Sequence, residues 1–157
     1  MWIKKVLLFV GVALAALGAQ AQTKAPAAGA AAAAVIGYVK TVKGEAFVDS
    51  GGQAIKAVEG TPLKVGDVVR TGANGSAGIT LKDITVLSFG PSTRFTLDEY
   101  LFAPAKGDLK LGGRLASGSL HYVSGLIAKA KPEAVNVKTP TGTIGVRGTR
   151  FVAVVAP

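Results

Sequence analysis

The sequence predicts an all-β fold, made of many short strands in a twisted sandwich or a solenoid-like arrangement. Short runs rich in Val, Ile, Thr and aromatic residues recur along the chain, and Gly, Pro, Asn or Asp residues separate them at short intervals. No segment shows a sustained helical period with caps. The nearest, Leu126–Ala134, contains Pro132, which disfavours a long helix. Periodicity alone leaves a sandwich, an irregular barrel and a coiled solenoid open.

The N-terminal residues have the features of a secretory signal peptide. Lys4 and Lys5 precede an apolar run shorter than a bilayer-spanning helix, and an Ala-Gln-Ala cleavage site ends at Ala21. We expect residues 1–21 to be removed near Ala21, giving a periplasmic or secreted bacterial protein without a stable transmembrane anchor; an uncleaved anchor is the alternative. The chain has no cysteine that could carry a lipid, and a core without disulfides suits the periplasm.

The rest of the chain divides into a tether and one domain. Residues 22–34 are nearly pure Ala with Lys, Pro and Gly, and they lack the large apolar side chains needed for a core. They are interpreted as a flexible tether. Residues 35–157 then form the β domain, which is long enough for a modest single core.

The formal net charge of +9 narrows the classes of partner. A basic protein attracts nucleic acid, anionic lipid or acidic polysaccharide. Export makes nucleic acid an unsuitable partner, and the lysines are spread along the chain without interleaved aromatic residues, as is typical of a solvated surface.

No arrangement of residues indicates catalysis. The one histidine, His121, lies between Leu120 and Tyr122 in a strand-like run, where a structural role is favoured over a Ser-His nucleophile. One histidine without cysteine excludes a histidine-rich metal site, and the carboxylates are scattered. We therefore predict no catalytic, cofactor-binding or metal-binding residue and no enzyme; a small hydrolase is the weaker alternative.

The glycines at 142, 145 and 148 superficially resemble a phosphate-binding loop. Such a loop requires a helix after it, so that the helix N-terminus meets the phosphate. Residues 150–155 are instead strongly β-prone, so the phosphate-binding interpretation fails.

Four blocks carry a more specific pattern. Gly37–Val48 has the spacing of an opening β-hairpin, and Gly60–Asp83 contains G-x-x-L-x-x-G-D-x-V-x-T-G followed by Asn74-Gly75, which predicts a second hairpin turn. Phe89–Leu97 follows, and Val137–Val155 contains V-x-T-P-x-G-x-x-x-V-R-G-T-x-F.

In this order the blocks resemble the FecR-type domain, the periplasmic sensing domain of ferric-citrate-type iron-uptake regulators. The resemblance implies a regulatory domain whose motif residues are mainly structural. These residues are Gly60, Leu63, Gly66, Asp67, Thr71, Gly72, Asp83, Thr139, Pro140, Gly142, Arg147, Gly148, Thr149 and Phe151. The chain departs from the pattern at Ile84, where the family usually has Gly, so we expect this turn to differ in type.

The last block predicts a turn and a final strand. Thr139-Pro140 and Gly142 allow the chain to turn or bulge into the last ladder, because Pro has no N–H to donate and Gly tolerates unusual dihedral angles. In the strand that follows, alternate residues from Phe151 to Val155 share one face, and Phe151 is predicted to anchor the core.

Two arginines lie in this block. We predict that Arg147 forms a bidentate ion pair with Asp67 or Asp83, tying the last strand to earlier turns, with an acidic partner as the alternative. Arg150 is expected to face solvent or a partner.

The sequence thus predicts a non-catalytic interaction or sensing module without a cofactor. It is expected to bind another envelope protein, by strand addition at an open sheet edge. The alternative is a basic module that associates with peptidoglycan or another acidic glycan.

Overall fold

The computed structural model describes residues 33–148 and 150–156, and the predicted signal peptide and most of the predicted tether lie outside them. The elements are β1 (Val35–Lys43), β2 (Ala46–Ser50), β3 (Gln53–Lys56), β4 (Pro62–Lys64), β5 (Val68–Thr71), β6 (Ser76–Leu81), β7 (Val86–Phe89), β8 (Arg94–Ala103), β9 (Asp108–Val123), α1 (Leu126–Ala130), β10 (Val135–Thr139), β11 (Gly142–Gly145) and β12 (Arg150–Val155). The prediction of an all-β fold is confirmed. The short α1 ends before Pro132, as a proline at that position requires.

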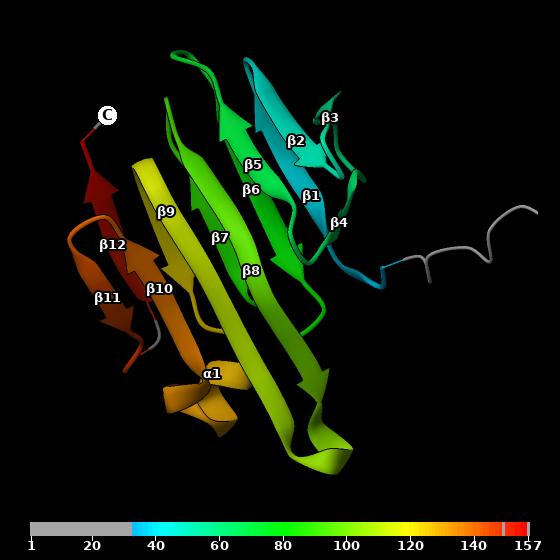
Figure 1. Cartoon of the computed structure of the whole chain (residues 1–157), viewed down its shortest axis with the longest axis vertical. Coiled ribbons are helices and arrows are strands. Elements are labelled where there is room, and N and C mark those ends of the chain that lie inside the picture. The colour runs from blue at the N-terminus through cyan, green and yellow to red at the C-terminus, as the bar shows by residue number, and fades with distance from the viewer. Residues whose placement is uncertain (1–32, 149, 157) are drawn as a thin grey trace, which may run out of the picture. The chain divides into compact units, whose positions relative to one another are not determined.

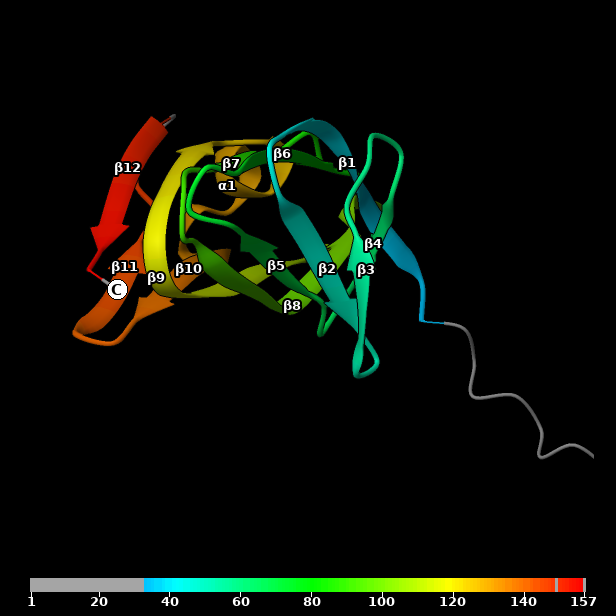
Figure 2. The same cartoon turned by 90° about the horizontal axis from the view of Figure 1, so that it is seen from above.

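The strands form one curled sheet, in the order β3-β2-β5-β8-β9-β7-β6-β1-β4 (Figure 1). Seen from above, it folds over into a first layer (β1, β4, β6, β7, β12) and a second layer (β2, β3, β5, β8, β10, β11), joined by β9 (Figure 2). All strand pairs are antiparallel except β9 with β10. This half-barrel corresponds to the sandwich or barrel alternatives and not to a solenoid.

β9 joins the layers because it bends in the middle. Its first part pairs with β8, up to Ser117, and its last part, from Leu120, pairs with β7. Gly118 lies between them with φ +85°, and a Cβ atom there would overlap Thr93. Because glycine adopts this backbone conformation without strain, one continuous strand can serve both layers.

The core lies between the two layers. Alternate residues of the central strands point inward, as the period of a β-strand requires, whereas the edge strand β3 is exposed throughout. The largest fully buried side chains are Val39, Val48, Leu63, Val69, Ile79, Leu87, Phe95, Leu97, Leu115, Leu120, Tyr122 and Ile127. Gly113 on β9 is the cross-strand partner of Leu97, and the ring of Phe95 occupies the space that a Cβ atom at Gly113 would need.

Both predicted hairpins in the first half of the domain are wrong. β1 pairs with β4 and β6, whereas β2 pairs with β3 and β5, so Gly37–Val48 crosses between layers. The Asn74-Gly75 turn likewise leads from β5 in the second layer to β6 in the first. Turn residues determine where the chain reverses, but strand pairing depends on contacts distant in sequence.

The predicted turn and final strand of the closing block are confirmed. Pro140 and Thr141 form the turn between β10 and β11, and the Thr139 hydroxyl donates to the carbonyl of Gly142 at 3.0 Å. In β12, Phe151 is half-buried and stacks on the ring of Tyr122, with 4.9 Å between ring centroids. Ala153 lies on the same face and is buried.

Ile84 has φ +62°, a left-handed conformation that β-branched residues resist, and its side chain is 55% exposed. We expect Ile84→Gly to raise the free energy of unfolding by about 1 kcal/mol, because relief of backbone strain outweighs the added entropy of the unfolded chain. Ile84→Ala, which keeps a Cβ atom, should recover only part of this gain. Thermal unfolding of the wild-type protein and the two variants measures the differences in stability. A lower unfolding midpoint for Ile84→Gly than for the wild-type protein would contradict the prediction.

Candidate functional site

Asp83 is the centre of a buried polar cluster. Its side chain is 0% exposed, and one carboxylate oxygen accepts from the Thr85 hydroxyl at 2.6 Å and from the Ile127 backbone N–H at 3.3 Å. The other accepts from the Tyr100 hydroxyl at 3.1 Å, and the Asp83 backbone N–H donates to the same phenol oxygen at 2.9 Å. Asp83 thus joins the β6–β7 turn, β8 and the start of α1.

The environment of Tyr100 keeps its phenol protonated, so that the hydroxyl can donate a hydrogen bond. Burial raises the pKa of Tyr100 far above its usual range, and the charge of Asp83 acts in the same direction. The phenol therefore stays protonated and can donate to the carboxylate. Tyr100 gives no signal of this role in the sequence, because it comes from a strand distant from Asp83.

Asp67 organises the turn between β4 and β5. Its carboxylate accepts from the Lys64 backbone N–H at 2.8 Å, and its side chain is 3% exposed. The backbone of the same turn pairs with β8: the Leu97 N–H donates to the Asp67 carbonyl at 3.0 Å, and the Gly66 N–H donates to the Leu97 carbonyl at 2.7 Å. The role of Asp67 is thus to order a turn.

Thr71 belongs to a second buried cluster, beside the bend of β9. Its hydroxyl donates to the Gly90 carbonyl at 2.6 Å and accepts from the Thr93 N–H at 2.9 Å. The Thr93 hydroxyl donates to the same carbonyl at 2.8 Å and accepts from the Ser119 N–H at 3.0 Å. The cluster connects the end of β5 to β9.

The remaining motif residues also serve turns and the core. Gly60 and Gly66 have positive φ, Leu63 is fully buried, and the Gly72 N–H donates to the Glu45 carbonyl at 2.8 Å. The Gly148 carbonyl accepts from the Ser124 hydroxyl at 2.7 Å. Thr149 lies outside the described residues.

The predicted ion pair of Arg147 is wrong. Arg147 is exposed in the loop before β12, whereas Asp67 and Asp83 are buried and already hydrogen-bonded to uncharged groups. Within the described residues, Arg147 takes part in no ion pair. Arg150 is exposed at the start of β12, as expected.

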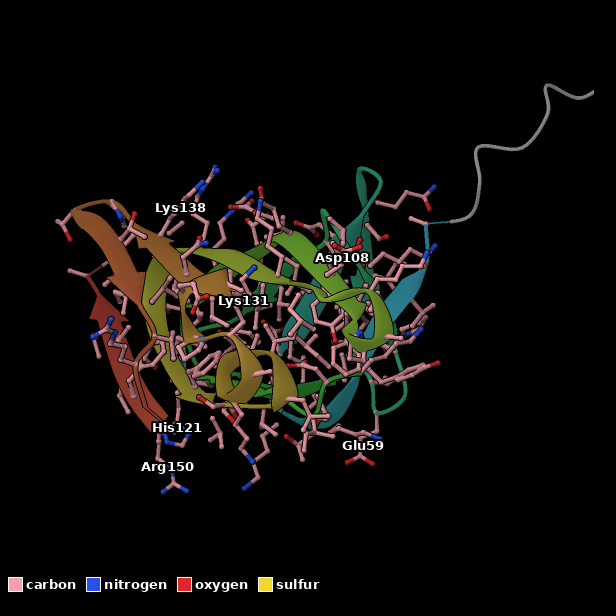
Figure 3. All side chains as sticks on the ribbon, turned by 90° about the horizontal axis from the view of Figure 1, so that it is seen from below. Glu59, Asp108, His121, Lys131, Lys138 and Arg150 are labelled. Atoms are coloured by element: carbon pink, nitrogen blue, oxygen red, sulfur yellow. The ribbon has the colours of Figure 1, made fainter. Side chains whose placement is uncertain are left out.

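The structure places His121 as a strand residue of β9. Its cross-strand neighbours are Ser88 on β7 and Val152 on β12. It projects from the first layer on the same side as Arg150, and Lys138 projects on the opposite side of the domain (Figure 3). Over residues 33–148 and 150–156, no group of three or more His, Asp or Glu side chains is placed to hold a metal ion.

The open edge of β12 is the feature best suited to bind a partner. β12 pairs with β9, and in the described part of the chain no strand pairs with its other edge (Figure 2). Val152 and Val154, on its outer face, are 63% and 75% exposed. The sequence analysis assigned the inner face to the core but missed these valines, although the same alternation places them outside.

β12 differs from the other edge strands. It has six residues, whereas β3 and β11 have four and β4 has three. A longer edge offers more backbone hydrogen bonds to an incoming strand. On the inner face of β12, the ring of Phe151 stacks on the ring of Tyr122 in β9. This contact keeps β12 in place before any partner binds.

Comparison with known proteins identifies the family. A family model described as FecR protein matches residues 67–156. No curated protein and no solved structure was found to match the chain. Strands β1 and β2 precede the matched residues, yet they pair with β6 and β5 within the match, so the folded unit is larger than the matched segment. In the part of the chain that the structure describes, no helix has the length and apolar character needed to cross a bilayer. The family consists of regulatory sensing domains, and this chain belongs to the FecR family.

Proposed function

We propose that the domain is a non-catalytic interaction module of the periplasm, which binds an extended segment of another envelope protein along β12. The observation that carries the proposal is the open edge of β12, with Val152 and Val154 exposed beside it. The unpaired backbone groups of an edge strand can pair with a strand of another chain, and neighbouring side chains then give specificity.

β12 is held in place before a partner binds, which favours strand addition. A free strand loses conformational entropy when a partner fixes it. β12 is already held by its ladder with β9 and by Phe151, so on the domain's side little of this cost remains. Val152 and Val154 would then pack against apolar side chains of the added strand.

A periplasmic location and a lack of catalysis are parts of the same proposal. The location is supported by the signal-peptide features that end at Ala21. A non-catalytic role is supported by the motif residues, since Asp67 and Asp83 are engaged in turns, and by the position of His121 between Ser88 and Val152.

We expect the double variant Val152→Lys/Val154→Lys to lose the envelope partner, because lysines on an edge strand oppose strand addition. The full chain with a tag would be used to capture partners from the envelope fraction at low and at moderate salt. The wild-type protein should retain one discrete protein at both salt concentrations, since strand pairing, unlike ion pairing, resists screening.

The matched control is Ile55→Lys on β3, another edge strand with an exposed apolar residue. The Ile55→Lys variant should retain the partner. In a separate measurement on the wild-type protein, the backbone amides of residues 150–155 should become protected from hydrogen exchange when the partner binds. Equal loss in both variants, or unchanged capture by the β12 variant, would contradict the proposal. Recovery of glycan alone, lost as salt rises, would do the same.

A further inference from the structure

The outer face of the second layer carries rows of cations that face each other across strands. Arg70 on β5 is directly opposite Arg94 on β8, and Arg114 on β9 is directly opposite Lys138 on β10. Lys138 projects away from the domain on the side opposite to His121 and Arg150 (Figure 3). This surface, which we call the cationic face, is therefore separate from the outer face of β12.

The carboxylates on the cationic face do not neutralise it. Asp49 forms a bidentate pair with Arg70, at 2.6 and 2.7 Å. Asp98 lies 3.4 Å from Arg114, and Glu99 pairs with Lys110 at 2.8 Å. The described residues form no other ion pair, so Arg94 and Lys138 have no carboxylate partner within ion-pair distance.

The opposed cations on the cationic face lower the stability of the folded domain. Like charges directly opposite each other on neighbouring strands destabilise a sheet. Here Arg70 is opposite Arg94 and Arg114 is opposite Lys138, and the carboxylates of Asp49 and Asp98 beside the two arginines offset part of each repulsion. A ligand with negative charges along its length would relieve both repulsions on binding.

The shape of the cationic face indicates which kind of ligand fits. Neighbouring strands lie about 4.8 Å apart, so four successive strands from β5 to β10 place cations along a stripe of about 14 Å. Between the cations the outward side chains are Thr96, Ala116 and Asn136, and Gly112 is buried beside Glu99, the carboxylate that pairs with Lys110. A stripe of cations of this kind suits a linear polyanion lying across the strands, whereas insertion into lipid would need large apolar side chains.

We infer that the cationic face binds a linear acidic polysaccharide across β5, β8, β9 and β10, with Arg94 and Lys138 as its unpaired cations. This inference does not depend on strand addition at β12, because the two surfaces have no residue in common. The polymer supplies repeated carboxylates, the guanidinium and ammonium groups supply the opposite charges, and the small side chains of Thr96 and Ala116 allow close approach.

The test uses the full chain and polygalacturonate, a linear polymer with one carboxylate on each sugar, with neutral dextran as the control ligand. The expected result is binding to polygalacturonate that weakens as salt rises. Arg94→Glu/Lys138→Glu should weaken the apparent affinity roughly tenfold at low salt. Lys40→Glu/Lys43→Glu makes the same charge change on exposed residues of β1 and should change the affinity less than about twofold.

Two further measurements keep the result specific. Backbone amide resonances of Thr96, Gly112 and Asn136 in the wild-type protein should shift on titration with polygalacturonate, and Val152→Lys/Val154→Lys should not weaken binding. Equal weakening by both charge-reversal pairs would show diffuse attraction and overturn the inference. No binding to polygalacturonate, or face-dependent binding only to phosphatidylglycerol vesicles, would overturn it too.

Discussion

Asp83→Ala is expected to lower the free energy of unfolding by about 3 kcal/mol or more. The substitution leaves the Thr85 hydroxyl, the Tyr100 hydroxyl and the Ile127 N–H without their buried acceptor. Each buried donor left unsatisfied costs about 1–3 kcal/mol. Urea unfolding at constant temperature, followed by far-ultraviolet circular dichroism, measures the loss.

The matched control for this prediction is Asp108→Ala. Asp108 is an exposed aspartate at the start of β9, and its removal should change stability by less than about 0.5 kcal/mol. Asp83→Asn keeps the size of the side chain and one acceptor oxygen, so it should fall between the other two variants. A loss below about 1 kcal/mol for Asp83→Ala would show that the cluster does not hold the turn to β8 and α1.

Gly118→Ala is expected to destabilise the domain by about 2–5 kcal/mol. With φ +85°, an alanine is strained at this position, and its Cβ atom would overlap both the backbone and the hydroxyl of Thr93. The overlap would disturb the hydrogen bond from the Ser119 N–H to the Thr93 hydroxyl, which fixes the bend of β9. Denaturant unfolding measures the loss.

Gly107→Ala separates the effect of backbone strain from the effect of overlap with Thr93. Gly107 also has positive φ, +72°, but a Cβ atom there would meet no neighbouring atom within 4 Å. This variant should cost about 1 kcal/mol, from backbone strain alone. If the two alanine variants lose the same stability, then the close approach of Thr93 is not what requires glycine at the bend.

The bend of β9 also explains how the domain carries two separate surfaces. The part before Gly118 contributes Arg114 to the cationic face, and the part after it pairs with β12 beside His121. Since the layers face each other across the core, the outward residues of the two parts point to opposite sides (Figure 3). One strand thus supports both the proposed edge and the cationic face.

Local patterns in the sequence predicted the elements that depend on local chemistry. The alternation from Phe151 to Val155 placed the inner residues of β12 correctly, and Pro132 limited α1 to a short helix. Ile84, where the family usually has Gly, has positive φ, so the departure marked a position of backbone strain, while the expected change of turn type stays a prediction. In each case the physical cause lies within a few residues of the signal.

The tertiary structure alone decided which distant residues meet. Asn74-Gly75 marked a turn, but only the fold shows that it connects two layers. Arg147 was predicted to pair with Asp67 or Asp83, yet both carboxylates are buried and accept hydrogen bonds from uncharged groups, so no guanidinium has to be buried with them. Strand pairing and burial depend on the order of strands in the sheet, which local residue patterns do not contain, and so the open edge and the cationic face became visible only in the folded domain.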